Sequence, residues 1–487
     1  MTATPGQGGG TDVRAESAAI LERARTGTRL MTMRGAAMRF ISVGANLLLL
    51  VPVSPSELGL LAVARGTFSL LQYVAELGIG KALVRRPEAP TAREYAALAG
   101  LQLLVGSLIV VVGFYWSRPI LGFGSLDQRW HLPMLGTVAT MLSLAFGTGA
   151  RVRLERALAY ERLAIVDVFN VLALNVGLVI FALLQQFSIG VFVILGVATV
   201  AANALLYAWA PGPVPSLDLR PLAGVARQSS GFLVASTLQI LREQGTPVVV
   251  GSLFGLPVAG LYSFAERVAQ VLNITFDGFR NAAVPAAARL AHDWAGLRAL
   301  ATRTLAGSLS LTAPAAIIAV CALPVLGAAV PRWSAAIPLT QWYVVAYAFF
   351  GVVVASMEPA AVAVRGAQAA VIEQGSALLA GWVTFAAVRP LGAEYLPLAV
   401  AAMYVAPVLA LRLVTTDPIR PEVTREVTHT AAAFVACLTL YLALRLLSAP
   451  LLLTATLPPL VMLAAVPRFR RMPRQLALQW FRRRQRA

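Results

Sequence analysis

The sequence predicts an all-α polytopic membrane protein with about 14 transmembrane helices, arranged as two parallel six-helix repeats followed by a C-terminal helix pair. Composition decides the class, because 58% of the 487 residues are hydrophobic, only 13% are charged, and the mean hydropathy is +0.74. A soluble domain is about 45–50% apolar and about 25% charged. Apolar runs near the ~20 residues that a helix needs to cross a bilayer recur from Leu30 to Leu463.

The apolar runs provide the order of the predicted elements. The candidate spans are residues 30–53, 59–83, 95–117, 132–150, 163–184, 188–208, 228–250, 258–282, 304–326, 337–357, 371–388, 395–413, 429–447 and 449–466. The predicted regions are a cytoplasmic leader with an interfacial helix at 1–29, an N-terminal lobe at 30–208, a cytoplasmic linker at 209–227, a C-terminal lobe at 228–413, an extra helix pair at 414–466 and a basic cytoplasmic tail at 467–487. Prolines concentrated in the linker mark the division between the lobes.

A polar stripe occurs twice on the predicted helices, at an offset of 201 residues. The first stripe is Arg65, Ser69, Gln72 and Glu76, and the second is Glu266, Gln270, Asn273 and Asp277. The steps of 4, 3 and 4 residues put each stripe on one helix face. The stripes lie on the second and eighth spans, and this even difference of six returns the chain to the same side of the membrane, so the repeats are parallel. Two related lobes around a polar cavity are typical of a transporter.

A second pair of stripes supports the duplication, at an offset of 200 residues. Polar character is kept between Arg39, Ser42 and Asn46 on the first span and Gln239, Arg242 and Thr246 on the seventh. Small residues also recur: Gly59, Gly260, Gly78 and Gly80 are expected to permit close packing. Pro247, Pro314, Pro324 and Pro359 interrupt predicted helices, either as points that bend or as static kinks.

The net charge of +18 is distributed as an orientation signal. Basic residues cluster in alternate loops, and the loops of the opposite side hold only Arg118, Arg129, Arg332, Arg389 and Arg445. The basic side is the cytoplasmic one, so both termini are predicted to be cytoplasmic. The arginines of the tail are expected to lie against anionic membrane lipids. No aromatic interleaving or binding-domain motif accompanies the charge, so nucleic acid is not a predicted partner.

The sequence contains no pattern typical of an enzyme. It has no nucleotide-binding loop, nucleophile triad or metal-ligand spacing, so we expect no catalytic residues, no metal and no cofactor. Cys321 and Cys437 lie in or beside apolar spans and are interpreted as packing residues. Asp167 and Asn170 share one face of the fifth span and are expected to join helices through polar contacts.

Three segments carry a family resemblance. Residues 54–86, SPSELGLLAVARGTFSLLQYVAELGIGKALVRR, are similar to the second helix and following loop of polysaccharide flippases. GLYSFAERVAQ and PAAARL within 254–290 resemble the corresponding region of the second half, and RLERALAYERLAIVDVFN at 153–170 resembles the Arg-rich link into the fifth helix. On these motifs, which are spread over residues 30–413, the chain resembles the polysaccharide flippases of the multidrug, oligosaccharidyl-lipid and polysaccharide (MOP) exporter superfamily.

The resemblance implies a V-shaped bundle of two six-helix lobes that rock to alternate access. It also implies a substrate: undecaprenyl-diphosphate-linked oligosaccharide, flipped across the bacterial cytoplasmic (inner) membrane for O-antigen, exopolysaccharide or capsule synthesis. Partners implied by this role are a polysaccharide polymerase and glycosyltransferases.

The polar residues on the spans are the candidate site. A charge near the bilayer centre costs about 2.5 to 3.5 kcal/mol, so these residues are expected to face protein or water. The guanidinium group matches phosphate oxygens, which makes the arginines the candidate ligands of a diphosphate headgroup: Arg65, Arg242, Arg267 and Arg39. Candidate sugar or cavity contacts are Ser69, Gln72, Asn46, Gln270 and Asn273. Candidates for coupling to a proton or sodium ion, or for pairing between lobes, are Glu266, Glu243, Glu76 and Asp277.

Alternatives remain open at this stage. Arg65 and Glu266 occupy equivalent repeat positions and could simply pair with each other. For the whole protein, the alternatives are a cation-coupled multidrug or metabolite antiporter of the same superfamily and a non-transporting membrane scaffold for glycosyltransferases. An antiporter of this kind is expected to have a more acidic cavity with fewer arginines, so the arginines argue against it. A scaffold that transports nothing would not need the polar stripes.

Overall fold

The computed structural model describes residues 34–466, except for 36, 39, 77, 87, 124–127, 273–282, 285, 415–420 and 422–423. The described part is helical throughout its regular structure, without strands. Ten of its helices are long and apolar enough to cross a membrane. The predicted all-α polytopic class is therefore confirmed, while a count of fourteen spans is not. The leader at 1–29 and the tail at 467–487 lie outside the described residues.

The chain forms two compact units. The first comprises residues up to Val53, Leu71–Leu121 and Asp127–Ser230, and the second comprises Ser54–Leu70, Gly122–Leu126 and the chain from Gly231 onward. Helix α2 (Pro55–Glu76) therefore begins in the second unit and ends in the first. The lobe limits at 208 and 228 stay predictions.

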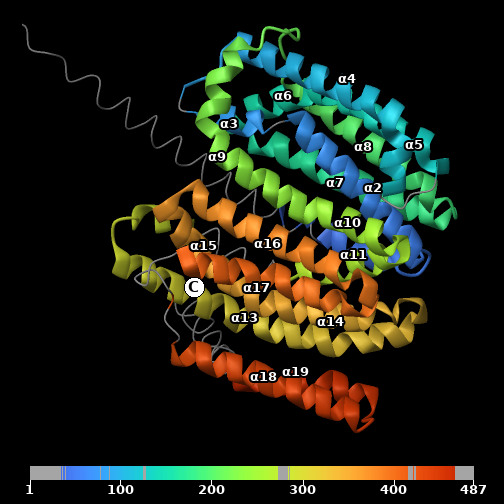
Figure 1. The fold of residues 1–487 in the computed structure, drawn as a ribbon, viewed down its shortest axis with the longest axis vertical. Coiled ribbons are helices and arrows are strands. Elements are labelled where there is room, and N and C mark those ends of the chain that lie inside the picture. Colours follow the sequence, from blue (N-terminus) through green and yellow to red (C-terminus); the bar gives the residue numbers. More distant parts are fainter. Residues whose placement is uncertain are drawn as a thin grey trace, which may run out of the picture. The chain divides into compact units, whose positions relative to one another are not determined.

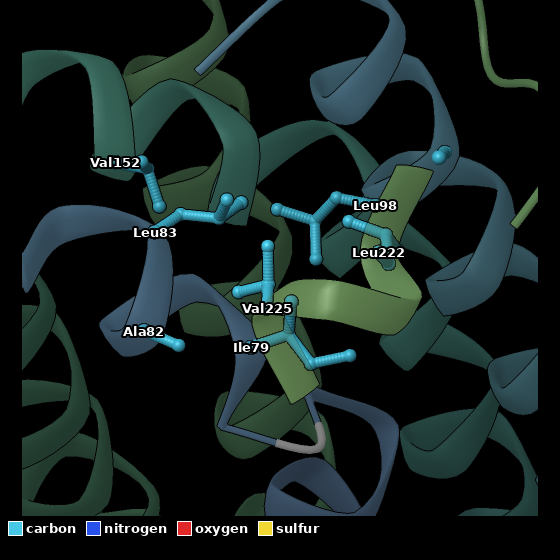
Figure 2. Packing of buried hydrophobic residues seen from close by; sticks show 8 residues of the cluster. Ile79, Ala82, Leu83, Leu98, Val152, Leu222 and Val225 are labelled. Carbon is cyan, nitrogen blue, oxygen red and sulfur yellow. The ribbon is translucent and has the colours of Figure 1, made fainter. Parts of the chain in front are cut away.

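The first unit consists of helices that pack around small aliphatic side chains. After the last residues of α2 they are α3 (Ile79–Arg85), α4 (Ala92–Phe123), α5 (His131–Ala139), α6 (Leu144–Arg156), α7 (Tyr160–Leu183), α8 (Phe187–Trp209) and the start of α9 (Ala223–Ile240). Figure 2 shows one buried cluster, in which Leu83 of α3, Leu98 of α4 and Val225 of α9 converge. The α3 segment is thereby fixed to helices that lie far from it in sequence.

The predicted span 59–83 is two helices instead of one. Helix α2 ends at Glu76, and α3 begins at Ile79 after Gly78, whose φ of 63° lies in the left-handed region. A side chain at that φ is strained, so glycine suits the break. Gly78 is buried as well, so this conformational role adds to the close packing predicted for it.

Capping residues define where two of the long helices begin. Before α4, the Thr91 Oγ1 accepts from the Glu94 N–H at 3.2 Å, and the Glu94 carboxylate accepts from the Thr91 N–H at 2.6 Å. Ser54 and Glu57 form the same reciprocal pair before α2. Each pair satisfies amide groups that a helix start leaves without an intrahelical acceptor.

The Pro-rich linker is anchored on the first unit. The Ser216 N–H donates to the Ala96 carbonyl at 2.8 Å, and a Cβ on Gly100 would lie 1.9 Å from the Ser216 carbonyl oxygen. The Arg153 guanidinium also donates to the Ala210 carbonyl at 2.5 Å. The linker therefore packs along α4 through contacts of its own backbone.

The second unit holds the remaining helices and the first part of α2. They are α10 (Thr246–Phe254), α11 (Leu256–Gln270), α13 (Trp294–Ala329), α14 (Ala336–Ala346), α15 (Val352–Arg365), α16 (Ala367–Val388), α17 (Leu396–Val414), α18 (Arg425–Leu446) and α19 (Leu451–Ala465). Helices α16 and α17 form an antiparallel hairpin, and α18 and α19 pack beside α13 at one edge of the unit (Figure 1). The Gln341 amide of α14 donates to the Tyr441 hydroxyl of α18 at 2.6 Å, which connects this edge to the interior of the unit.

Candidate functional site

Equivalent glycines bring the two repeated helices together within the second unit. A Cβ on Gly59 of α2 would lie 1.9 Å from the Leu256 carbonyl oxygen, and a Cβ on Gly260 of α11 would lie 1.8 Å from the Pro55 carbonyl oxygen. Gly59 and Gly260 are related by the offset of 201 residues, and so are Pro55 and Leu256. The contact is thus symmetric, as two copies of one repeat would make it around a twofold axis, and it supports the proposed duplication.

Arg65 lies less than two helical turns beyond this crossing, and its neighbour fixes its position. The Arg65 side chain is exposed, whereas Ala64 and Gly66 on either side are buried. A Cβ on Gly66 would lie 2.4 Å from the Gln244 carbonyl oxygen, so only glycine permits this approach of α2 to the segment that carries Arg242.

Arg242 and Glu243 lie in a π turn, Leu241–Gly245, between α9 and α10. Pro247 explains the wide turn, because it has no N–H to donate to the carbonyl of residue 243 and its ring crowds that carbonyl. The Thr246 hydroxyl donates to the Arg242 carbonyl at 2.5 Å and accepts from the Trp382 indole of α16 at 3.2 Å. The turn is therefore stabilised by side chains on both sides.

Glu266 of α11 is within electrostatic reach of four other charged side chains. It interacts electrostatically with Glu243, Arg267, Arg242 and Arg65. These five side chains, Arg65, Arg242, Glu243, Glu266 and Arg267, are called the charge cluster below. With three guanidinium groups and two carboxylates, the cluster has a formal excess of one positive charge. Of the predicted headgroup ligands, the structure brings three into this cluster.

One close contact inside the cluster joins chain neighbours. Arg242 Nη2 lies 3.7 Å from Glu243 Oε1, which also accepts a hydrogen bond from the Gln239 amide at 2.9 Å. Arg65 and Glu266 interact electrostatically, but no ion pair joins these two described side chains directly. The pairing of Arg65 with Glu266 consequently stays a prediction, and in this structure Arg65 offers an exposed guanidinium instead.

Two of the residues predicted to contact the sugar, Ser69 and Gln270, belong to the second unit and follow members of the charge cluster on the same helices. Ser69 is half-buried one turn after Arg65, and Gln270 is exposed at the end of α11. Three predicted residues lie outside the described residues: Arg39, Asn273 and Asp277.

The other predicted contacts belong to the first unit. Asn46, Gln72 and Glu76 are half-buried there, and the Gln72 amide donates to Glu76 Oε1 at 3.5 Å. Gln72 and Glu76 line a cavity of about 340 Å³. The stripe on α2 is therefore divided between the units, with Arg65 and Ser69 in the second and Gln72 and Glu76 in the first.

An ion-pair network occupies one wall of that cavity. The Asp167 carboxylate accepts from Arg34 at 2.5 Å and from Arg151, which also lies 3.9 Å from Glu155. The polar contact predicted for Asp167 takes the form of charge pairing, which joins residues of the first and fifth predicted spans to Arg151 of α6.

Sequence reasoning missed a buried tyrosine cluster next to the charged groups. The hydroxyls of Tyr262 and Tyr343 lie 3.4 Å apart, and the Tyr404 hydroxyl donates to that of Tyr343 at 3.5 Å. Tyr404 also interacts electrostatically with Arg242. The signal available in the sequence was Tyr262, which precedes Glu266 by one helical turn.

Glu373 was also missed. This carboxylate on α16 is 3% exposed, accepts from the Gln374 amide at 2.9 Å, and interacts electrostatically with Arg242. A lone acid inside an apolar run is the signal that identifies it, because an intramembrane charge is costly and usually functional.

The charged groups favour an anion over a metal ion. Guanidinium groups bind phosphate and carboxylate in a forked geometry. Within the described residues, no group of three or more His, Cys, Asp or Glu side chains is arranged to hold a metal ion. Cys321 and Cys437 are both buried, as expected for packing residues.

A family model supplies the identification. The model for polysaccharide biosynthesis proteins matches residues 52–333, more than half of the chain. The chain belongs to the polysaccharide biosynthesis protein family. The match includes every member of the charge cluster. A comparison with curated proteins found no match.

Solved structures establish the fold of this polysaccharide biosynthesis protein. It is similar to the lipid II flippase MurJ in an inward closed conformation, with a TM-score of 0.67 and 12% identity over 92% of this chain and 99% of MurJ. It is also similar to an inward-facing multidrug resistance MATE family transporter of the MOP superfamily, with a TM-score of 0.56 and 12% identity over 77% of this chain and 93% of the relative. The fold is therefore the one shared by this flippase and this transporter, as the resemblance in the sequence implied.

Proposed function

We propose that this protein flips undecaprenyl-diphosphate-linked oligosaccharide repeat units across the bacterial inner membrane by alternating access, for surface polysaccharide synthesis. The observation that carries the proposal is the charge cluster, which places three arginines within electrostatic reach of Glu266 on apolar helices of a polysaccharide biosynthesis protein. A diphosphate carries dense negative charge and needs such donors when it leaves the water phase. The similarity in fold to a lipid II flippase supports a lipid as the substrate.

Each arginine of the cluster has a distinct place in the proposal. Arg65 is exposed and offers its guanidinium to the diphosphate, whereas Arg242 and Arg267 are half-buried and set the positive potential behind it. Arg39 is proposed as a further headgroup ligand from the sequence alone. The sugar is proposed to contact Ser69, Gln72, Asn46, Gln270 and Asn273 through its hydroxyl groups.

Release of the diphosphate requires a competing anion. Glu266 is the proposed competitor, because it lies close enough to interact with all three arginines of the cluster. A proton or sodium ion taken up by Glu266 or Glu243 would reduce that competition and couple transport to an ion gradient, with Glu76 and Asp277 as further proposed coupling residues. The alternative supported by the second structural relative is a cation-coupled multidrug antiporter.

Substitution of the arginines tests the proposal. In a strain that lacks the native gene, Arg65→Ala and Arg242→Ala are expected to reduce export of the surface polysaccharide at least tenfold, because loss of a charge-assisted hydrogen bond removes about 1.5–3 kcal/mol. Arg332→Ala, a change at an exposed arginine outside the cluster, is the control and is expected to export normally. The membrane content of each variant is measured by immunoblotting.

Two results would contradict the flippase proposal. One is normal export by both Arg65→Ala and Arg242→Ala at wild-type protein levels. The other is normal surface polysaccharide in the deletion strain together with loss of resistance to cationic drugs, which would support the antiporter.

A further inference from the structure

The beginning of α13 extends beyond the part of the helix that the bilayer core can cover. Helix α13 has 36 residues, which span about 54 Å at 1.5 Å per residue, against about 30 Å for the hydrocarbon core. Its apolar run starts near residue 304, and the preceding segment contains Arg298 and Arg303. We therefore expect this first segment to lie at the level of the lipid headgroups.

A cavity of about 630 Å³ lies beside this segment. Its lining includes Trp294, Arg298, Thr302 and Arg303 of α13, and Thr424, which caps α18. Trp294, Arg298 and Thr302 follow one another at four-residue steps and share a helix face. Arg298 and Arg303 are separated by about 7.5 Å along the axis, so both can reach a group held between them.

The lining residues match the parts of a phospholipid at the membrane surface. The charged side chains that the described lining supplies are both arginines, which bind phosphate through a fork of N–H donors. The Trp294 side chain is 44% exposed, and tryptophan prefers the boundary between headgroups and acyl chains. Basic pockets between transmembrane helices favour anionic lipid headgroups.

We propose that this cavity between the starts of α13 and α18 binds the phosphate headgroup of an anionic phospholipid. Its residues are distinct from the charge cluster, so the inference does not depend on the transported substrate. The bound lipid would connect α13 to the C-terminal pair α18 and α19, because Thr424 belongs to the start of α18 and the arginines belong to α13. The lipid would thereby add to the direct packing of α18 and α19 against α13.

Lipid binding to the purified full-length protein in detergent tests the inference. Native mass spectrometry is used to titrate dioleoylphosphatidylglycerol, with dioleoylphosphatidylcholine as the zwitterionic comparison. The double variant Arg298→Ala/Arg303→Ala is expected to bind phosphatidylglycerol about 30-fold more weakly, because each arginine contributes about fivefold. Phosphatidylcholine binding is expected to stay unchanged.

The matched control removes the same charge elsewhere. Arg332 and Arg389 are exposed residues that follow α13 and α16, and Arg332→Ala/Arg389→Ala is expected to bind phosphatidylglycerol as the unmodified protein does. Equal losses in the two double variants would overturn the inference, since attraction by net charge would then suffice. Equal binding by Arg298→Ala/Arg303→Ala and the unmodified protein would overturn it as well.

A second variant tests the space inside the cavity independently of the arginine charges. Ala299→Trp fills the cavity while both arginines remain, and it is expected to reduce phosphatidylglycerol binding without lowering the thermal midpoint in lipid-free detergent. Undiminished binding by Ala299→Trp would place the lipid elsewhere. Inorganic phosphate at 100-fold excess distinguishes the source of the ligand phosphate: failure to displace the lipid supports a phospholipid site, and full displacement would replace it by a site for free phosphate.

Discussion

At the scale of single residues, the repeated position occupied by Arg65 and Glu266 differs in charge between the two repeats. In an exact duplication both would carry the same sign, and they would repel each other. Here the opposite signs attract, and Glu266 also lies within electrostatic reach of Arg242 and Arg267. As a result, the five side chains of the charge cluster keep one formal positive charge in excess. Glu266 belongs to the same cluster and can compete with an anionic ligand for the arginines.

The glycine pair at the helix crossing provides a residue-scale prediction. Gly59→Ala would place a methyl group 1.9 Å from the Leu256 carbonyl oxygen, and a backbone atom cannot move aside as a side-chain tip does. We expect a net loss of about 1–3 kcal/mol in stability, although alanine itself favours a helix by about 0.5–1 kcal/mol. The thermal midpoint in detergent is the measurement.

Gly136→Ala is the matched control for this prediction. Gly136 is also a helical glycine, and a Cβ there would meet nothing within 4 Å. Its midpoint is expected to stay equal or to rise. A Gly59→Ala protein as stable as Gly136→Ala would show that α2 and α11 do not cross at this glycine.

At the scale of elements, the π turn before Pro247 determines where Arg242 lies. Regular α-helix through residues 241–245 would change the direction of Arg242 relative to α10. The turn is stabilised by the hydrogen bonds of Thr246 to the Arg242 carbonyl and to Trp382. Pro247 thus acts on the site through the backbone, at a distance of five residues along the chain.

Pro247→Ala provides the element-scale prediction. The new N–H can donate to the carbonyl of residue 243, so we expect the turn to convert to α-helix and polysaccharide export to fall at least fivefold while the protein stays folded. Pro324→Ala, within the uninterrupted helix α13, is the control and is expected to export normally. Unchanged export by Pro247→Ala would remove the π turn from the proposed mechanism.

At the scale of the whole molecule, two features define the chain: membrane-spanning helices in two compact units, and helix α2, which contributes to both. A conformational change that moved one unit would therefore act on α2.

The basic loops predict that the linker is cytoplasmic and that the loop after α16 is on the opposite side.

Cysteine labelling tests this orientation. Val214 in the linker is 84% exposed, and Leu391 after α16 is 57% exposed, while both native cysteines are buried. A membrane-impermeant maleimide is expected to label Leu391→Cys in intact cells and Val214→Cys only after permeabilisation. The reverse pattern would invert the predicted topology.

Several elements could be predicted from the sequence because their signals are local. The apolar runs predict the long helices, since hydrophobicity and length are properties of consecutive residues. The offset of 201 residues relates Gly59 to Gly260 and Arg65 to Glu266 through residue identity and spacing alone. Glycines are less easily interpreted, because the packing role predicted for Gly78 takes no account of the positive φ that ends α2.

The sequence by itself determined the membrane class, the duplicated pattern and the identity of most candidate site residues, because composition and periodicity depend only on the order of residues in the chain. Only the tertiary structure decided which side chains meet. It brings Glu266 within electrostatic reach of Arg65, Arg242, Glu243 and Arg267, and it places the hydroxyls of Tyr262, Tyr343 and Tyr404 beside them. It also divides the stripe on α2 between two units. The physical reason is that these interactions join residues up to 201 positions apart, as between Arg65 and Glu266. Their geometry depends on how the helices cross, which the close approach of two backbones at Gly59 and Gly260 sets.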